Sequence, residues 1–451
     1  MRFFESFASF LGTSLTPVSL VISSLFLIPF VRPLRMLRPR RFIRTLTDLP
    51  DGAKSSPLKA LSVALAGTLG VGNITGVTSA LLTGGPGAVF WMWIGCIAVL
   101  PVKYAEVSLA VRYRKRRNDD WVGGAMYYMR DGLADCGHPK LGLAVGSVFA
   151  VLCCLNSLVT GNLVQANAAV SAVPASWRLP AAFLLMLMTA LAFLYGTNKV
   201  ERITCRLIPP LSLLYFLLSL GIILANAPLV PSIFRGIVSA AFSSRAVLGA
   251  AAGFSVREAL RFGVMRGIFS NEAGCGTSPT AHASAETKSP HHQAAWGIVE
   301  AGFDTLVLCT VTALVLLIGD ARFGLIPWHH EVDASPVTLG IFSSLTGDWA
   351  AVFLSVSILL FAYATILAQS FYGIRAIGFL TDKKIPQFVY AVLSVVSPLI
   401  GAVITAPVMW LTADTLLGIM TAVNAVILIV LRRSCRSPDP RKVRRQPASR
   451  C

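Results

Sequence analysis

Charged residues are scarce in this chain. Only 13% of its 451 residues are charged, whereas 55% are hydrophobic. Several apolar runs reach the roughly 20 residues that a helix needs to cross a bilayer. A soluble class is therefore excluded, and the composition predicts an all-α membrane protein with many spans.

Metal-binding and catalytic patterns are also missing. The nine cysteines show no metal-ligand spacing, and several of them fall in apolar or interrupted segments, so no disulfide framework is expected. There is no Ser–His–Asp order, no pair of catalytic carboxylates and no metal cluster. We therefore expect neither an enzyme nor a bound cofactor.

The formal net charge is +18. In a soluble protein this charge would point to nucleic acid, but here the basic residues gather in short loops beside apolar runs. In that position they orient helices and contact anionic lipids, so the bilayer is the expected partner. The first apolar run, Leu15 to Phe30, precedes its arginines. Because a cleaved signal peptide has the reverse order, we expect this run to remain as a helix.

The apolar runs predict about eleven spans, and the first lies near 12–31. The connections 112–140, 227–256 and 320–346 are expected to be loops. The ten spans after the first split into two groups of five. The predicted units are an N-terminal helix with a basic cytoplasmic loop (1–57), a first five-helix repeat (58–226), an extracytoplasmic connection (227–256), a second five-helix repeat (257–431) and a basic cytoplasmic tail (432–451).

Loop charge gives the expected orientation. In an eleven-span count, the basic clusters all fall on one side of the membrane. By the positive-inside rule that side is cytoplasmic, which places the C-terminus inside and the N-terminus outside. The clusters are 32–44, Arg112–Arg117, Lys199–Arg206, Lys383–Lys384 and the tail.

The span near 58–82 is interrupted at its centre. The stretch from Ala66 to Gly76 contains four glycines and Asn73, which weaken a helix. At membrane depth such a break is tolerated only where it is buried in protein or lines a polar cavity. The alternative is a glycine-rich seam for close helix packing.

The second group of five also begins with an interrupted span, near 257–284, with its break from Ser270 to Thr277. An odd number of spans in each group places the two groups in opposite orientations. Paired interruptions at matching positions are the best sequence indicator of a transporter's site at the bilayer midplane. The symmetry therefore favours the polar-cavity interpretation.

Facing breaks suit a zwitterion. Half-helix N-termini offer N–H groups to a carboxylate, and unwound carbonyls offer partial negative charge to an ammonium group or a cation. Glu272, inside the second break, could face the cation or the amine, be protonated, or hydrogen-bond to the other broken segment. Glu300 and Asp304 lie one turn apart and are expected to pair with Arg261 or Arg266 or to join a cation path.

Several blocks keep their order and spacing from about 55 to 432. They are Thr68–Val77, Gly84–Trp93, Lys103–Glu106, Gly123–Tyr128, Gly161–Asn167, Arg266–Gly276, Ala281–Ala283 and Phe361–Leu367. Together they resemble the alanine or glycine:cation symporter family, also called sodium:alanine symporters. The resemblance implies a leucine-transporter-type fold with five-plus-five inverted repeats. It also implies import of small neutral amino acids, driven by Na⁺ or sometimes H⁺, across the plasma membrane of a prokaryotic cell.

The resemblance also implies a site, residue by residue. The substrate carboxylate should meet the backbone N–H groups of the first break, and the ammonium group should meet the second. The implied sodium ligands are carbonyls near Ala66 and Leu69 and the hydroxyl of Thr365, which could instead bond to a carbonyl four residues earlier. The implied substrate-binding residues are Thr68, Gly70, Val71, Gly72, Asn73, Gln165, Ser270, Asn271, Glu272, Gly274 and Gln369.

Three positions depart from the family pattern. Val71 and Ala364 stand where family members usually carry a threonine and a serine, and Gln369 stands where they usually carry a tryptophan. An amide in place of an indole should enlarge the substrate pocket and make it more polar. A proton-coupled carrier of a different or more polar amino acid is therefore the alternative.

An ion channel is a further class. Channels usually build rings of equivalent groups by oligomerisation, whereas two inverted breaks in one chain suit alternating access. We therefore expect a cation-coupled symporter and leave its amino acid, its ion and its oligomeric state open.

Overall fold

The computed structural model of this chain describes residues 7–8, 10–31, 64–65, 67–117, 120–194, 197–243, 255–287, 289–328 and 332–435. The basic loop expected before residue 58 and most of the basic tail lie outside these ranges.

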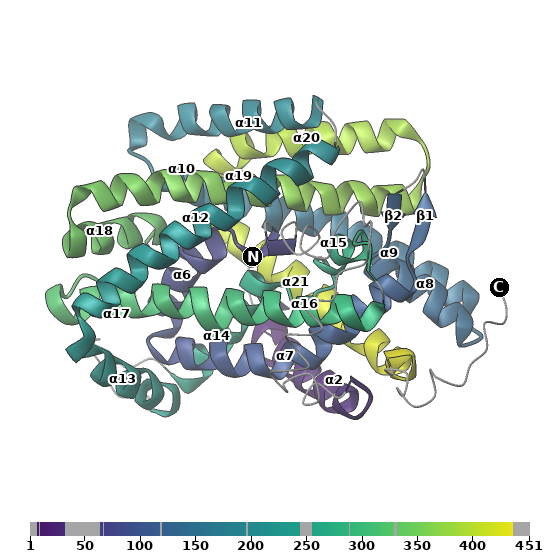
Figure 1. Cartoon of the computed structure of the whole chain (residues 1–451), viewed down its shortest axis with the longest axis horizontal. Coiled ribbons are helices and arrows are strands. Elements are labelled where there is room, and N and C mark those ends of the chain that lie inside the picture. The colour runs from purple at the N-terminus through teal and green to yellow at the C-terminus, as the bar shows by residue number, and fades with distance from the viewer. Residues whose placement is uncertain are drawn as a thin grey trace.

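Long helices lying side by side make up most of the molecule (Figure 1). In the described residues, eight helices are long and apolar enough to cross a membrane. They are α7 (Gly87–Arg112), α9 to α10 (Pro139–Ser171), η4 to α11 (Ala175–Leu194), α12 (Thr197–Ala225, with Arg206–Ala225 as its apolar part), α16 to α17 (Pro290–Phe323), α19 (Asp348–Leu380), α20 (Lys384–Val403) and α21 to η7 (Ala406–Cys435).

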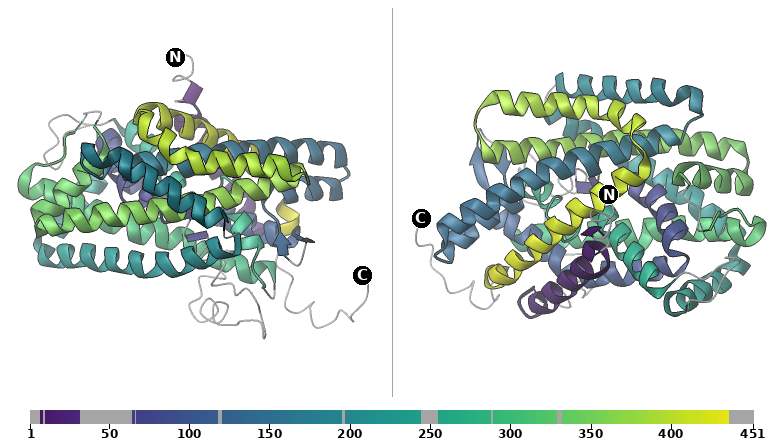
Figure 2. Two further views of the ribbon diagram at one scale, coloured as in Figure 1. Left: turned by 90° about the horizontal axis from the view of Figure 1, so that it is seen from above. Right: turned by 180° about the vertical axis from the view of Figure 1, so that it is seen from behind.

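The N-terminal helix α2 (Thr16–Val31) follows the short π-helix η1 (Leu11–Leu15). It packs against α7 and α21 and lies beside α21 in the view from behind (Figure 2). This helix matches the span predicted near 12–31.

Two helices are interrupted, as the glycine pattern predicted. The first stops after Thr68, passes through the 3-10 turn η2 (Val71–Asn73) and resumes as α6 (Thr75–Gly84). The second is α14 (Val256–Asn271), which is separated by an irregular segment from α15 (Pro279–Ala283). Both breaks are buried, so the unpaired backbone groups that they create must find partners within the protein.

Three segments expected to be loops contain regular structure. Residues 112–140 form the antiparallel strands β1 (Lys115–Arg117) and β2 (Asp120–Val122) and the helix α8 (Ala125–Asp135). The other two contain α18 (Ala334–Thr346) and the turn η5 (Ala227–Leu229) with α13 (Val230–Phe242).

These three helices are too short to span a bilayer, so a search for spanning runs passes over them. Each lies against a longer helix: α8 against α9, α13 against α7 and α18 against α19. On α13 the buried residues recur at helical spacing, at Ile233, Gly236, Ile237, Ala240 and Ala241. In Figure 1, α13 and α18 lie at one end of the bundle, and α8 lies with the hairpin at the other end.

The elements follow the same order in the two halves of the chain. A broken helix is followed by a long helix, a short helix and three further long helices, first from α6 to α12 and again from α14 to α21. The second long helix of one half and the first of the other contain π-helical turns, η3 (Val159–Leu163) and η6 (Phe303–Cys309). Such turns occur frequently at functional sites.

The β1–β2 hairpin is fastened to the second broken helix by Arg114. Its guanidinium lies 4.0 Å from the centre of the Trp121 ring, and its Nη1 donates to the carbonyl oxygens of Ala283 and Ala285. Burial lowers the pKa of Arg114 to about 10, so it stays charged at neutral pH. The end of α15 is therefore held from the hairpin side.

Candidate functional site

The first break places its backbone against two polar side chains. Gly70 is extended, at φ −115° and ψ −150°. A Cβ on Gly70 would lie 2.5 Å from Thr365 Oγ1 and 2.7 Å from Gln165 Oε1. Both approaches are closer than real Cβ contacts, so a side chain here would force Thr365 and Gln165 to shift; glycine is favoured by contact and not by backbone strain.

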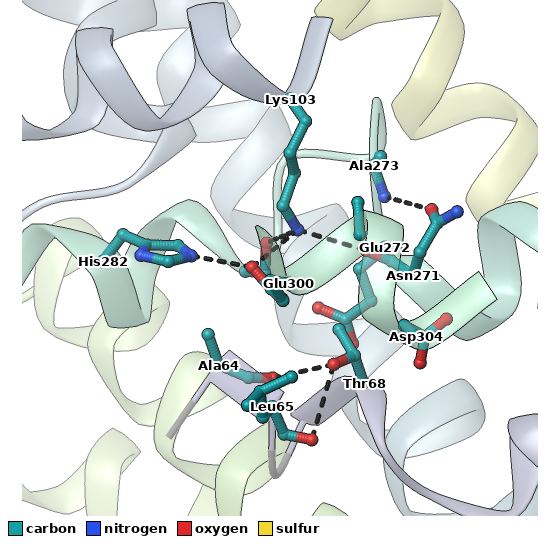
Figure 3. A network of polar contacts seen from close by, with 12 residues as sticks. Ala64, Leu65, Thr68, Lys103, Asn271, Glu272, Ala273, His282, Glu300 and Asp304 are labelled. Carbon is teal, nitrogen blue, oxygen red and sulfur yellow. Dashed lines mark hydrogen bonds and ion pairs between the residues drawn. The ribbon is translucent and has the colours of Figure 1, made fainter. Parts of the chain in front are cut away.

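Two polar groups of the first break are already engaged. The N–H of Val71 donates to Gln165 Oε1 at 3.0 Å. The hydroxyl of Thr68 donates back to the carbonyls of Ala64 and Leu65, at 3.2 and 3.4 Å (Figure 3). Any anion that binds to the Val71 N–H must therefore displace Gln165 or bind beside it.

The second break turns through left-handed conformations. Glu272 has φ 51°, and it is the only non-glycine residue with a positive φ in the described ranges. Gly274 and Gly276 follow with φ of 90° and 79°, values that L-residues with side chains rarely adopt. The left-handed residue after Asn271 ends α14 as a C-cap, with its N–H donating to Ile268 O at 2.9 Å.

The Glu272 carboxylate ties the second break to α19. Its Oε2 accepts from Thr277 Oγ1 at 2.7 Å, and its Oε1 accepts from Gln369 Nε2. Among the described residues, Glu272 therefore bonds within its own break and to α19 and not to the other broken segment. Gln369, one turn beyond Thr365 on α19, connects this helix to the second break through the same carboxylate.

The second break is also anchored by Glu106, which our sequence reasoning did not identify as a separate element of the site. The N–H of Gly274 donates to Glu106 Oε2 at 3.0 Å, and Asn424 Nδ2 donates to Glu106 Oε1 at 2.5 Å. Asn424 also donates to Gly274 O at 2.9 Å and accepts from Tyr128 OH at 2.6 Å. A carboxylate in the apolar run of α7 was the signal that could have indicated this role.

The two breaks meet at Asp304, in the π-helical turn η6. Asn73 of the first break donates to Asp304 Oδ1 at 2.7 Å, and Ser270 of the second donates to Oδ2 at 2.7 Å. Asn73 Nδ2 also lies 3.0 Å from Ser270 Oγ, and Asn271 Nδ2 donates to Thr305 Oγ1 at 2.9 Å. Asp304 therefore joins residues that are more than 190 positions apart in the chain.

The expected pairing of Glu300 or Asp304 with Arg266 is wrong. Arg266 instead forms a bidentate pair with Asp414, at 2.8 and 3.1 Å, and its guanidinium lies 3.9 Å from the centre of the Trp410 ring. Glu300 pairs with Lys103 at 3.1 Å, and both side chains are fully buried. In the described residues, the hydrogen bonds that Asp304 receives come from neutral donors.

Most residues of the predicted site thus gather around the two breaks. Gly70, Gln165 and Thr365 form one group, and Asn73, Ser270 and Asn271 form a second through Asp304. Ala66 lies outside the described residues, and Leu69 and Gly72 are buried. In the described part of the chain, no group of three or more His, Cys, Asp or Glu side chains could hold a transition metal. The oxygen atoms that line the breaks suit a hard monovalent cation instead.

A helical bundle with two interrupted helices that meet at buried polar groups is typical of secondary transporters. A solved structure shares this fold. The crystal structure of MhsT in complex with L-phenylalanine aligns with 83% of this chain and 95% of that chain, at a TM-score of 0.57 and 16% sequence identity. This likeness shows the leucine-transporter-type fold.

The chain belongs to the sodium:alanine symporter family, whose family model matches residues 1–437. It is 35% identical over 380 residues to the sodium/alanine symporter AgcS of Methanococcus maripaludis. That alignment covers 83% of this chain and 82% of the relative. It is 33% identical over 422 residues to the protein named "Probable sodium/glutamine symporter GlnT" of Bacillus subtilis, which covers 90% of this chain and 84% of the relative. The chain is thus a membrane transporter and not an enzyme, and the family resemblance seen in its motifs is confirmed.

Proposed function

We propose that this protein imports small neutral amino acids, such as alanine or glycine, together with Na⁺. The observation that carries the proposal is the meeting of the two breaks at Asp304, with Asn73 at 2.7 Å on one side and Ser270 at 2.7 Å on the other. A ligand bound between the breaks would contact both halves of the chain. Its binding could therefore favour one arrangement of the halves over another, which is the basis of alternating access.

For the substrate, we propose binding at both breaks. The carboxylate would meet N–H groups from Gly70 to Gly72, with Gln165 leaving Val71 or sharing it. The ammonium group would meet the oxygen atoms around Ser270, Asn271 and Glu272. The proposed set also includes Thr68, Asn73, Gly274 and Gln369. Gly274 would contribute by shaping the second break, because its N–H and C=O are already bonded to Glu106 and Asn424.

For Na⁺, we propose a site between the first break and α19. The hydroxyl of Thr365 lies beside Gly70, where a Cβ would approach it to 2.5 Å. The carbonyls of Ala66 and Leu69 would complete the site, because a hard cation prefers oxygen ligands and needs no buried counter-charge when several carbonyls surround it. Substrate and ion would then share the first break, which couples their binding.

We further propose that the two halves are inverted repeats and that the chain crosses the membrane eleven times. The eight apolar helices leave α2 and the two broken helices to be added, which gives eleven crossings. We place the protein in the plasma membrane of a prokaryotic cell. With this count the Arg112–Arg117 end and the C-terminus are on the cytoplasmic side, and the N-terminus is on the outer side. We place the two repeats at 58–226 and 257–431, and the repeated order of elements supports this division.

A more polar amino acid is the second candidate substrate, and one observation favours it. Gln369 is buried, and its Oε1 has no hydrogen-bond partner in the described residues. A buried acceptor left unpaired costs about 1–3 kcal/mol, and a substrate with a side-chain donor would remove that cost. The relative named for sodium and glutamine transport is consistent with such a substrate.

Reconstitution into liposomes tests these proposals directly. Uptake of labelled alanine, glycine, serine and glutamine would be measured under an inward Na⁺ gradient, an inward H⁺ gradient or neither. We expect saturable uptake that requires the Na⁺ gradient and is strongest for alanine or glycine. Stronger uptake of glutamine or serine would favour the second candidate, and ion flux without any amino acid would contradict a carrier.

A further inference from the structure

A buried charged cluster lies beside the proposed substrate site and has no part in it so far. It consists of Lys103 on α7, Glu300 and Gln293 on α16, and His282 on α15. Figure 3 shows Lys103, Glu300 and His282. All four side chains are fully buried. Groups of this kind are costly inside a membrane protein and usually mark an ion or proton pathway.

Lys103 links both sides of the second break to α16. Its Nζ lies 3.1 Å from Glu300 Oε2, 3.1 Å from Asn271 O and 2.5 Å from Ser278 Oγ. Asn271 ends α14 and Ser278 precedes α15. The ammonium group therefore holds the two half-helices together, and the Glu300 carboxylate holds the ammonium group.

His282 competes with Lys103 for that carboxylate. Its Nε2 lies 2.7 Å from Glu300 Oε2, the same oxygen atom that contacts Lys103. The other oxygen, Glu300 Oε1, has no hydrogen-bond partner in the described part of the chain. A second positive charge on the imidazole would share Oε2 with the ammonium group and weaken the hold on Lys103.

Gln293 determines which form of His282 is favoured. Gln293 Nε2 lies 2.8 Å from His282 Nδ1, and its Oε1 is buried without a partner in the described residues. An amide donates only through nitrogen, so Nδ1 accepts, Nε2 carries the hydrogen, and the ring is neutral. If the amide turns by half a rotation, Oε1 faces Nδ1, and the ring can donate from both nitrogens as an imidazolium.

Other charged and titratable groups lie around this cluster. Those that act on it from α7, the second break, η6 and α19 are Glu106, Glu272, Asp304 and Tyr372. On the hairpin side the guanidinium of Arg114 donates to the carbonyl oxygens of Ala283 and Ala285, which follow His282 in the chain. Charges of both signs therefore surround the imidazole.

We propose that His282, between Glu300 and Gln293, is a proton-binding site of this carrier. A proton that binds at Nδ1 makes Gln293 turn its amide and loosens Lys103 from Glu300, which weakens the link between the second broken helix and α16. Proton binding at this site therefore favours a conformation in which the second broken helix has moved relative to α16. The proposal concerns the proton alone and holds whichever amino acid the chain carries.

Histidine NMR tests the site without any transport measurement. The full-length protein, with ¹⁵N-labelled imidazoles, would be titrated in nanodiscs from pH 8 to pH 5. Because the chain has six histidines, the signal lost in His282→Gln identifies the ring. We expect a neutral ring with hydrogen on Nε2 at pH 8 and an imidazolium at pH 5. A ring that stays neutral throughout the range overturns the proposal.

A second variant tests the amide. Gln293→Glu presents only oxygen atoms to His282 Nδ1, so we expect its imidazolium to persist to higher pH than in the wild type. Gln293→Leu presents no acceptor, so its ring should stay neutral to lower pH. The same titration in both variants would contradict the role of Gln293 in proton binding.

The pH profile of uptake in liposomes then tests the functional consequence. We expect initial uptake to change between pH 7.5 and pH 5.5 in the wild type and to lose this change in His282→Gln. His291→Gln is the matched control, because His291 lies on α16, next in the chain after α15, but pairs with Tyr104 at 2.9 Å. Identical profiles in His282→Gln and the wild type would refute the coupling.

Discussion

The link between the two breaks can be tested by replacing Asp304 with Asn. The carboxylate accepts from Asn73 Nδ2 and Ser270 Oγ, each at 2.7 Å. An asparagine keeps the size of the side chain but offers a single acceptor oxygen, so one of the two contacts is lost. A hydrogen bond to a charged group contributes about 1.5–3 kcal/mol, so we expect substrate affinity to fall about 10- to 150-fold.

The same substitution should not lower the melting temperature. Within the part of the chain that the structure describes, the buried Asp304 carboxylate receives hydrogen bonds from neutral donors alone, and a buried charge without a cationic partner costs several kcal/mol of desolvation. Asparagine removes that cost. Thermal unfolding of the purified variant would therefore give an unchanged or higher Tm, while binding of labelled alanine in the presence of Na⁺ weakens.

Asp320→Asn is the matched control, because Asp320 lies on the helix that continues from η6 and accepts from the Ile326 N–H at 2.9 Å, at a distance from both breaks. It should bind substrate with wild-type affinity. Our reasoning is refuted if Asp304→Asn binds as tightly as the wild type. It is also refuted if affinity and Tm fall together, because that would indicate a general loss of structure.

Three further predictions concern the proposed binding residues. Gly70→Ala should abolish Na⁺-dependent binding, because its Cβ would lie 2.5 Å from Thr365 Oγ1. Gly76→Ala is the control and should bind normally, because its Cβ would come no closer than 4.0 Å to its neighbours. Equal binding by the two variants would show that the close packing at Gly70 is not needed for Na⁺-dependent binding. Thr365→Ala should raise the Na⁺ concentration needed for half-maximal uptake, with Thr365→Ser close to the wild type, and an unchanged Na⁺ dependence would remove this hydroxyl from the proposed site. Gln369→Trp should narrow the range of amino acids that compete with labelled alanine, because the indole is larger and has no acceptor; an unaltered competition profile would contradict its assignment to the pocket.

The positions of the two breaks could be predicted because their cause is local. Glycines at Gly70 and Gly72, and again at Gly274 and Gly276, weaken a helix wherever it forms. The left-handed φ at the second pair and the close approach of Gly70 to Thr365 give the structural reasons for these residues. The apolar runs fixed the long helices for a similar reason, since their length must match the bilayer.

The contacts of the buried charges could not be predicted in the same way. Lys103 and Glu300 are separated by nearly 200 positions, and nothing in the local pattern distinguishes this pair from the expected pair with Arg266. Only the three-dimensional packing of α7 against α16 brings the two together. What the sequence does contain is the presence of Lys103, Glu106 and Asp304 in apolar runs, which is a signal of function without an indication of partners.

The short helices were missed for a different reason. α13 and α18 are amphipathic or mixed in polarity, and their stability comes from one face that packs on a longer helix. Their residues therefore do not form the continuous apolar run on which the prediction of spans relied.

The hydrogen bonds from Arg114 to the carbonyls of Ala283 and Ala285 have a practical consequence. If α15 moves as a rigid body, either the β1–β2 hairpin moves with it or the hydrogen bonds from Arg114 to these two carbonyls break. One spectroscopic probe would be placed at the exposed Arg116 and a second on a distant long helix. The distance between the two probes would then report the movement of α15 in each transport cycle. The exposed hairpin would thus indicate the position of the buried second broken helix.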